Sequence, residues 1–442
     1  MSNSFEKSIS IITLGCSKNT VDSEFLARQL ETNGYKVFYD PEEITSKIAI
    51  VNTCGFINDA KEESINTILE LIQLKDKGMI EKLIVMGCLS ERYKGELRKE
   101  MPEVDHFYGV FDLPKIIESI KGVYNQQYKN IRTVSTLPHY AYLKISEGCD
   151  RTCSFCAIPL IKGKHISKPI DDLAEESISL TNDGVKEILL IAQDLTYYGI
   201  DLTRRQQLTN LVEKLIKIEK LRWLRLHYIY PLGFPLDVLR LMKNNEKVCN
   251  YLDIPFQHIN DKILKDMRRA VDKQKSMKLI ENIRKEVPDA ALRTTLMVGF
   301  PGEGDREFNE LMDFVQEVKF DRLGVFTYSE EEGTSAARNT RDTIPEEVKQ
   351  QRMEEIMALQ QDISLELNKK RIGKTYKTII DRLEGDYYIG RTELDSPEVD
   401  NEVLIESNSP LTIGEFYDIE ITDAENYDIL GRPKSEGRRK NE

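Results

Sequence analysis

Apolar and polar residues in the first part of the chain follow a pattern that predicts short strands separated by helices. Strand-like apolar runs and helical patterns alternate, the former at residues 9–14, 48–52 and 83–86 and the latter at residues 21–32 and 60–75. This alternation is typical of α/β folds. We therefore expect a small α/β domain over residues 1–124. A polar stretch predicts a linker at about residues 122–138.

From residue 140 the pattern of strand, loop and helix recurs about six times. The predicted strands cover residues 140–146, 187–192, 223–228, 251–255, 292–298 and 322–328. Such repetition predicts a parallel sheet, here an open (β/α)6 partial TIM barrel over residues 138–370, with its ligand site at the carboxyl ends of the strands. A long helix is predicted at residues 345–370, because Pro345 suits a first turn and Gly373 lies just beyond the end.

Beyond residue 370 the period of the apolar positions changes to two. Short β-rich runs separated by turns occupy residues 376–380, 387–392, 402–405 and 416–421. They predict a small antiparallel β-barrel over residues 371–433. Residues 431–442, which include Arg438, Arg439 and Lys440, are expected to form a disordered tail. The fold class is therefore α/β with three domains.

Composition narrows the classes of function. The chain has 442 residues and a formal net charge of −13, which disfavours nucleic acid as the main partner and favours a basic one. The sequence contains no stretch of the roughly 18 to 20 apolar residues that a membrane helix needs. We expect a soluble, cytoplasmic protein without membrane contact. Seven cysteines in such a protein favour metal binding or catalysis over disulfides.

Three cysteines, Cys149, Cys153 and Cys156, form a C-x3-C-x2-C loop directly after the first strand of the central repeat. Four cysteines would close a zinc or iron-sulfur site, so three indicate a cluster with one iron left open. Phe155 beside the last cysteine would help to exclude water from it. The alternative is a structural zinc site whose fourth ligand lies elsewhere.

A second group of cysteines is spread over the first domain. Cys16, Cys54 and Cys88 each follow an apolar strand and each adjoin a glycine. The carboxyl ends of the strands of an open α/β sheet meet at one crevice, and glycine allows close approach of the backbone. A single cysteine of this kind is usually an ordinary buried thiol. Three with the same surroundings predict a second cluster with three protein ligands.

These motifs resemble known families. The C-x3-C-x2-C loop with an aromatic residue before its last cysteine resembles the radical S-adenosylmethionine superfamily. Residues 14–24, 52–57 and 86–89 look like the N-terminal domain of the methylthiotransferases, and residues 371–433 look like their TRAM domain.

The resemblance implies two 4Fe-4S clusters, S-adenosylmethionine and an external electron donor. The radical cluster would lie on Cys149, Cys153 and Cys156, and the auxiliary cluster on Cys16, Cys54 and Cys88. S-adenosylmethionine would bind the open iron and yield a radical that takes hydrogen from an unactivated C–H bond, and the auxiliary cluster would present the sulfur.

Polar or glycine-bearing loops follow the second and fifth central strands. Gln193, Asp194 and Gly299 lie in them and could hold the methionine and ribose parts of S-adenosylmethionine. His258 could face the same site or form a structural hydrogen bond. We expect Cys249 to be a core residue.

The methylthiotransferase family has branches that modify tRNA adenosine and one that modifies the β-carbon of an aspartate of ribosomal protein S12. Over residues 371–433, six basic against fifteen acidic residues leave a net charge of −9, which would attract a basic ribosomal protein and repel phosphates. Lys18-Asn19 and Val21-Asp-Ser-Glu24 also resemble the ribosomal-protein branch, although Ser17 replaces its common proline. We predict the S12 enzyme, with nucleic acid contact possible but not favoured by charge.

Two alternatives remain at this stage. One is a tRNA methylthiotransferase, which would need a basic groove and would bind tRNA in a salt-sensitive way. The other is a non-catalytic iron-sulfur or zinc protein that binds RNA or carries electrons. It would not cleave S-adenosylmethionine on reduction.

Overall fold

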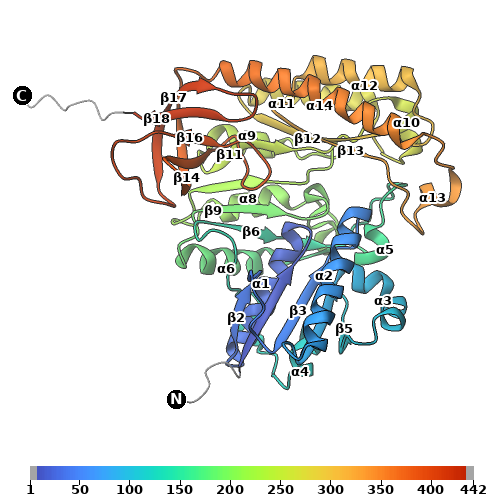
Figure 1. Cartoon of the computed structure of the whole chain (residues 1–442). Coiled ribbons are helices and arrows are strands. Elements are labelled where there is room, and N and C mark those ends of the chain that lie inside the picture. The colour runs from blue at the N-terminus through green and yellow to red at the C-terminus, as the bar shows by residue number, and fades with distance from the viewer. Residues whose placement is uncertain (1–6, 435–442) are drawn as a thin grey trace, which may run out of the picture.

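The first domain is a parallel five-stranded sheet covered by helices on both faces (Figure 1). The structure is a computed structural model that describes residues 7–434. The strand order is β2-β1-β3-β4-β5, with bounds β1 Ser8–Thr13, β2 Lys36–Tyr39, β3 Ile48–Thr53, β4 Lys82–Gly87 and β5 His106–Phe107. The helices are α1 Ser17–Thr32, α2 Asn58–Asp76, α3 Cys88–Glu100 and α4 Leu113–Ser119. The strands and helices predicted for this region are confirmed, and β2 and β5 are additional edge strands.

Alternate side chains of β3 pack into two separate hydrophobic cores, one on each face of the sheet. Ala49 and Val51 pack with α2 and α3 on one face, whereas Ile50 packs with α1 and α4 on the other. Burial on both faces explains why this strand is an unbroken apolar run.

The central domain contains a six-stranded parallel sheet of order β13-β12-β11-β10-β9-β6. Its strands are β6 Tyr140–Lys144, β9 Glu187–Ile191, β10 Trp223–Leu226, β11 Val248–Asp253, β12 Ala291–Val298 and β13 Arg322–Thr327. A two-stranded sheet, β7 Ser146–Glu147 with β8 Ile166–Ser167, follows β6. The predicted open barrel of six strands is confirmed.

Helices cover the outer face of this sheet and form the largest core with it. The longer ones are α6 Ile170–Asn182, α8 Leu208–Leu215, α9 Asp237–Asn244, α11 Lys273–Glu286, α12 Asp305–Val318 and α14 Glu346–Lys369. Short helices are α5 Ile158–Lys162, α7 Ile200–Thr203, α10 Asp261–Asp266, α13 Ser335–Asn339 and the 3-10 turns Gln126–Tyr128 and Leu195–Tyr197. Pro345 stands at the start of α14, as predicted.

The last domain is a closed barrel of order β14-β15-β16-β18-β17. Its strands are β14 Thr375–Glu384, β15 Tyr387–Thr392, β16 Val403–Ile405, β17 Phe416–Ala424 and β18 Ile429–Pro433. The expectation of a disordered tail from residue 431 is wrong at its start, because residues 431–433 belong to β18. A glycine and a proline there resemble a turn in the sequence, but β18 pairs with β17 and β16. Residues 435–442, including Arg438, Arg439 and Lys440, lie outside the described residues.

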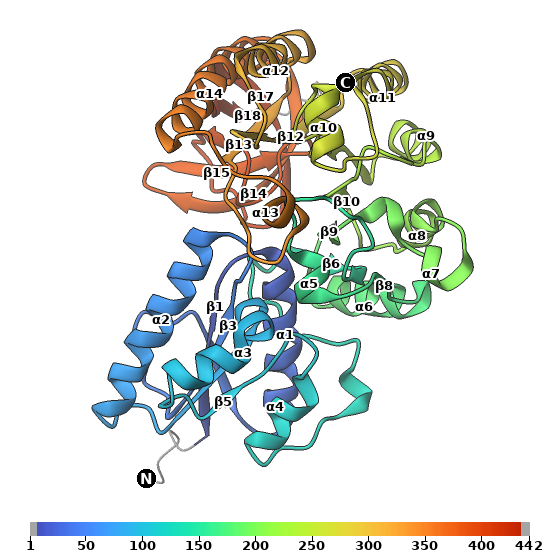
Figure 2. The same cartoon turned by 90° about the vertical axis from the view of Figure 1, so that its right-hand side faces the viewer.

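The segment predicted as a linker is firmly packed. The Arg132 side chain is buried between Glu24 of the first domain and Glu176 of the central domain, and its Nε donates to Glu176 at 2.8 Å. At another point of the same junction, Lys61 on α2 and Arg92 on α3 bind Glu331 at 3.0 and 2.8 Å, beside α13 (Figure 2). The first two domains are therefore held in a defined orientation.

The C-terminal barrel packs into the inner face of the central sheet near its amino end. Arg391 of β15 binds Glu187, the first residue of β9, at 2.7 Å, and Arg225 of β10 binds the same carboxylate at 2.7 Å. Arg322, the first residue of β13, binds Asp395. The carboxyl end of the central sheet is thereby left for the site. No helix within residues 7–434 is long and apolar enough to cross a membrane.

Candidate functional site

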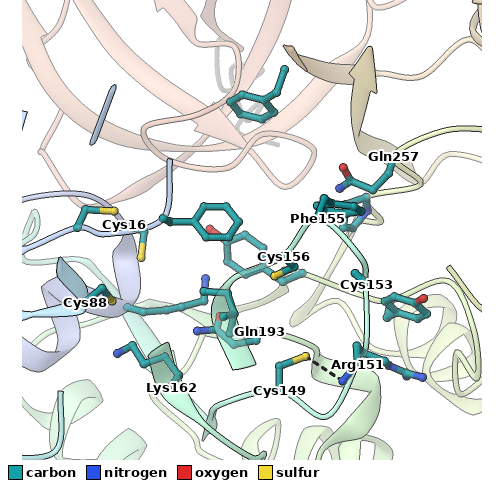
Figure 3. Close-up of a pocket in the computed structure, with 18 of the residues that line it drawn as sticks. Cys16, Cys88, Cys149, Arg151, Cys153, Phe155, Cys156, Lys162, Gln193 and Gln257 are labelled. Atoms are coloured by element: carbon teal, nitrogen blue, oxygen red, sulfur yellow. Dashed lines mark hydrogen bonds between the residues drawn. The ribbon is translucent and has the colours of Figure 1, made fainter. Parts of the chain in front are cut away.

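A cavity of about 430 Å³ lies where the carboxyl ends of the two parallel sheets meet, and all six predicted cysteines line it. Figure 3 shows Cys16 and Cys88 on one side and Cys149, Cys153 and Cys156 on the other. Its volume falls within the usual range for small-molecule sites. The fold thus brings together two groups of thiols that lie more than 50 residues apart in the sequence.

The first group, which we call the N-terminal triad, comes from three adjacent strands. Cys16 precedes α1 after β1, Cys54 follows β3, and Cys88 begins α3 after β4. These strands are neighbours in the order β1-β3-β4. The thiols therefore meet because parallel strands end at the same edge of the sheet.

Glycine is required beside these cysteines by close contacts. A Cβ at Gly15, where φ is +96°, would lie 2.7 Å from Cys54 Cβ, and one at Gly87, where φ is +101°, would lie 2.5 Å from Thr53 O. Both the left-handed backbone and the crowding exclude larger residues. The recurrent pairing of glycine with cysteine thus reflects the approach of the strand ends to one another.

The second group, the central triad, lies on the loop after β7. Arg151 N donates to Cys149 Sγ at 3.4 Å, and Arg269 Nη1 lies 3.8 Å from Cys153 Sγ. The loop is fixed from below because Ser154 N donates to Met267 O at 2.9 Å. Phe155 lines the cavity and also packs against the apolar cluster that contains Met267. Its side chain can therefore both anchor the loop and exclude water.

Burial controls the protonation of these thiols. It raises the pKa of Cys88 to about 12, although the nearby Lys162 ammonium opposes the shift. Burial also raises the pKa of Cys149 to about 11 and that of Cys156 to about 12. Without a metal these thiols hold their protons at neutral pH, whereas coordination removes them.

The donor set decides which metal group fits. Among residues 7–434, no group of three or more His, Cys, Asp or Glu side chains stands so that it could hold a single metal ion. A 4Fe-4S cluster differs because each thiolate binds a different iron atom, so its ligands stand apart. Each side of the cavity carries three thiols, which is the number of protein ligands that such a cluster with one iron left free would need.

Charge in the cavity wall is one-sided. The cations Lys18, Arg151, Lys162 and Arg269 line it, and no Asp or Glu is among the lining residues that the structure describes. Arg151 Nε binds Asp194 at 2.8 Å, and Lys162 Nζ lies 3.3 Å from Glu147. The cavity therefore favours ligands that carry negative groups.

The remaining predicted residues divide into two kinds. Gln193 lines the cavity. Asp194 does not; its carboxylate holds Arg151 and accepts from Thr196 N. Gly299 also lies outside the lining, and a Cβ there would meet Lys349 Cγ at 2.3 Å. Close packing against Lys349 therefore explains the glycine at this position.

His258 and Cys249 have structural surroundings. His258 is fully buried, its Nδ1 accepts from Asn260 N at 3.0 Å, and it does not line the cavity. Cys249 packs with Trp223 and Tyr251 between the central sheet and the C-terminal barrel.

Several lining residues were not identified from the sequence: Lys18 as a lining side chain, Arg151, Ile158, Lys162, Tyr228, Tyr230, Gln257, Arg269 and Phe326. Arg151 could have been found, because it lies inside the cysteine loop. Arg269, in the loop after α10, and Phe326, in β13, carry no signal of their own, since only the folded chain brings them to the cavity.

Three families match successive parts of the chain. They are the Uncharacterized protein family UPF0004 at residues 8–109, the Radical SAM superfamily at residues 143–315 and the TRAM domain at residues 372–433. The second match implies a 4Fe-4S cluster and S-adenosylmethionine.

Among solved structures, the radical S-adenosylmethionine methyltransferase TsrM from Kitasatospora setae matches with a TM-score of 0.54 at 12% identity, over 75% of this chain and 77% of that chain. The cobalamin-dependent S-adenosylmethionine radical enzyme OxsB matches with a TM-score of 0.53 at 11% identity, over 75% and 55%. At such identities the likeness concerns the fold alone.

Curated relatives are far more similar. The ribosomal protein uS12 methylthiotransferase RimO of Bacteroides fragilis is 55% identical over 96% of this chain and 99% of its own. Those of Bacteroides thetaiotaomicron and Flavobacterium psychrophilum are 56% and 51% identical, each over 96% of this chain and 98% of its own. Identity at this level over nearly the full length confirms the resemblance seen in the motifs, and the chain belongs to the ribosomal protein uS12 methylthiotransferase family of radical S-adenosylmethionine transferases.

Proposed function

We propose that this protein attaches a methylthio group to the β-carbon of an aspartate of ribosomal protein S12. Relatives that bear the name of this activity span nearly the whole chain. The observation that carries the proposal is the meeting of two cysteine triads at one cavity. One triad suits a radical cluster and the other a cluster that presents sulfur.

The central triad would hold the radical cluster, and the N-terminal triad the auxiliary one. When bound, the reduced clusters and S-adenosylmethionine supply the electron, the radical, the sulfur and the methyl group that convert an unactivated C–H bond into a C–S bond. An external donor would provide the electrons. Gln193, which lines the cavity, would contact the cofactor, and Phe155 would keep water from the central triad.

The C-terminal barrel is suited to attract a basic protein. Exposed acidic side chains are spread over it at Glu384, Asp386, Glu406, Asp418, Asp423 and Glu425. Exposed basic side chains there include Lys374 and Lys377. The excess of negative charge would speed the encounter with a basic ribosomal protein and slow that with tRNA.

Substrate choice can be tested directly. The reduced, reconstituted enzyme is incubated with S-adenosylmethionine and either S12 or bulk tRNA, and the products are weighed by mass spectrometry. We expect the added mass of a methylthio group on S12 alone. The same mass on tRNA, with unmodified S12, would favour the tRNA branch, and no S-adenosylmethionine cleavage would exclude both.

The two-cluster assignment predicts a specific loss. A variant with Cys16, Cys54 and Cys88 all replaced by alanine should retain about half of the iron, because only the three thiolates of the central triad would still bind a cluster. It should still form 5′-deoxyadenosine but transfer no sulfur. The measurement is iron and sulfide content after anaerobic reconstitution.

The seventh cysteine provides a matched control. Cys249→Ala removes a thiol that does not line the cavity, so this variant should keep the full iron content. Equal iron in the triple variant and the parent would remove the auxiliary cluster from the proposal.

A further inference from the structure

Lys18 is one of two lining cations, with Arg269, for which the structure shows no carboxylate partner among the described residues. Its side chain is 7% exposed and lines the cavity. Among the described residues, no carboxylate lies within 4.0 Å of its ammonium, whereas Arg151 and Lys162 both have one. A buried cation without a counter-charge is costly, so a site of this kind is built for an anionic ligand.

The contact that Lys18 does make is with an aromatic ring of the other domain. Its Nζ lies 3.5 Å from the centroid of the Tyr228 ring. A ring face attracts an ammonium group but carries no net charge, so it orients the cation without neutralising it.

Hydrogen bonds of its backbone groups hold Tyr228 in place. It follows β10 with φ of +58°, a left-handed conformation that is uncommon for a residue of this size. Tyr228 N donates to Asp253 Oδ2 at 3.1 Å, and its carbonyl accepts from Leu195 N at 3.1 Å. Strain of this kind persists where the surrounding structure enforces it, often at a ligand site.

The position of Lys18 fits a substrate group better than a cofactor group. Lys18 lies two residues after Cys16 of the N-terminal triad, and its ammonium rests on a residue of the central domain. Arg269, the other lining cation without a carboxylate partner within 4.0 Å among the described residues, contacts Cys153 of the central triad. Lys18 therefore reaches from the first domain to the central domain inside the cavity that both triads line, where the proposed function would place the carbon to be modified.

We propose that the Lys18 ammonium binds the side-chain carboxylate of the substrate aspartate and thereby selects aspartate over uncharged side chains. The inference rests on the proposed function, since it names the group that recognises that substrate. A charge-assisted bond to a carboxylate in a water-poor cavity is strong, and it is lost when the carboxylate becomes an amide.

The test compares S12 with an S12 variant in which asparagine replaces the target aspartate. We expect the parent enzyme to prefer aspartate by about 100-fold in kcat/KM, because the amide cannot neutralise the buried ammonium. Lys18→Met keeps the aliphatic stem and should reduce this preference below about threefold, mainly through KM. Lys18→Arg keeps the charge and should retain most of the preference.

Three controls separate the possible outcomes. Lys164→Met removes an exposed lysine and should behave like the parent. Iron content and 5′-deoxyadenosine formed without substrate should stay within about twofold of the parent in Lys18→Met, because the radical chemistry does not use this residue. Thermal unfolding shows whether Lys18→Met folds. If it does not, the ratio of the kcat/KM values for aspartate and asparagine in Lys18→Arg decides whether the proposal holds.

The proposal is overturned if Lys18→Met keeps the preference of the parent, or if it loses iron or cofactor cleavage, which would place Lys18 on the cluster side. The proposal would also be overturned if Lys18→Arg preferred aspartate over asparagine by less than about threefold, as expected for a site without the charge. Failure of the parent to modify S12 at all would refute the proposed function, and this outcome is distinct from the others.

Discussion

Buried charged side chains occur at both ends of the central sheet. Those at the amino end are paired with opposite charges, whereas one at the carboxyl end is not. At the amino end, Arg391 and Arg225 share the carboxylate of Glu187, and Arg391 also binds Asp381 at 2.6 Å. At the carboxyl end, Lys18 lines a cavity without a carboxylate partner within 4.0 Å among the described residues. Paired charges fix the C-terminal barrel in place, whereas the unpaired cation is available to a ligand.

The largest expected effect comes from breaking the paired end. Arg391→Ala removes one of the two guanidiniums that bind Glu187 and the guanidinium that binds Asp381, and both carboxylates are almost fully buried. The loss should lower the free energy of unfolding by about 3–5 kcal/mol, the usual range for breaking a buried ion pair. Urea unfolding of the full-length protein would measure it.

An exposed pair on the same barrel gives the control. Arg432 lies 3.3 Å from Glu420, and its side chain is 65% exposed. Arg432→Ala should change the free energy of unfolding by less than about 0.5 kcal/mol, because water screens such a pair. Similar losses in both variants would mean that the Arg391 network does not hold the barrel.

Lowering the pH should remove part of the stability that the ion pairs of Arg391 provide. Burial opposes ionisation of Glu187, but the guanidiniums of Arg391 and Arg225 outweigh it and lower its pKa. The pKa of Asp381 is lowered in the same way, with burial opposed chiefly by Arg391. A carboxyl with a lowered folded-state pKa stabilises the fold above its ordinary pKa, and this stability is lost as the pH falls through the folded-state value.

Unfolding midpoints between pH 7 and pH 3 would show this loss. The slope should be shallower in Arg391→Ala, since the carboxyls then lose their main partner. Asp400 acts in the opposite direction, because burial raises its pKa despite Arg293 and Arg322. Equal slopes in parent and variant would contradict the role given to Arg391.

The smallest effect is expected at the cavity, where Asp194 acts through Arg151. Asp194→Asn weakens the bond that orients this guanidinium in the cavity wall. Loss of one charge-assisted bond, about 1.5 kcal/mol, corresponds to roughly a tenfold rise in the KM for S-adenosylmethionine. The rate of 5′-deoxyadenosine formation at varied cofactor concentration would measure it.

Asp171→Asn is the matched control, because that side chain is 92% exposed and its contact with Lys214 is screened by solvent. An unchanged KM in Asp194→Asn would show that Arg151 keeps its position without the carboxylate. The cavity would then depend less on its surroundings than the paired end does.

The sequence by itself determined the three domains' fold class and the six cysteines, because strand periodicity and short loop motifs are local properties. The glycines beside these cysteines are also visible in the sequence, and they indicate that the backbone is closely packed where the strands end. The last strand was missed, since Gly431 and Pro433 disfavour a strand locally and only pairing with β17 and β16 holds it.

Tertiary structure alone decided which charges are paired. Arg391 and Glu187 lie 204 residues apart and meet because the barrel enters the inner face of the sheet. Lys18 and Tyr228 meet for the same kind of reason, across a domain junction. The charge of a side chain is written in the sequence, but its free energy depends on the groups that surround it, and these are brought together only by the folded chain.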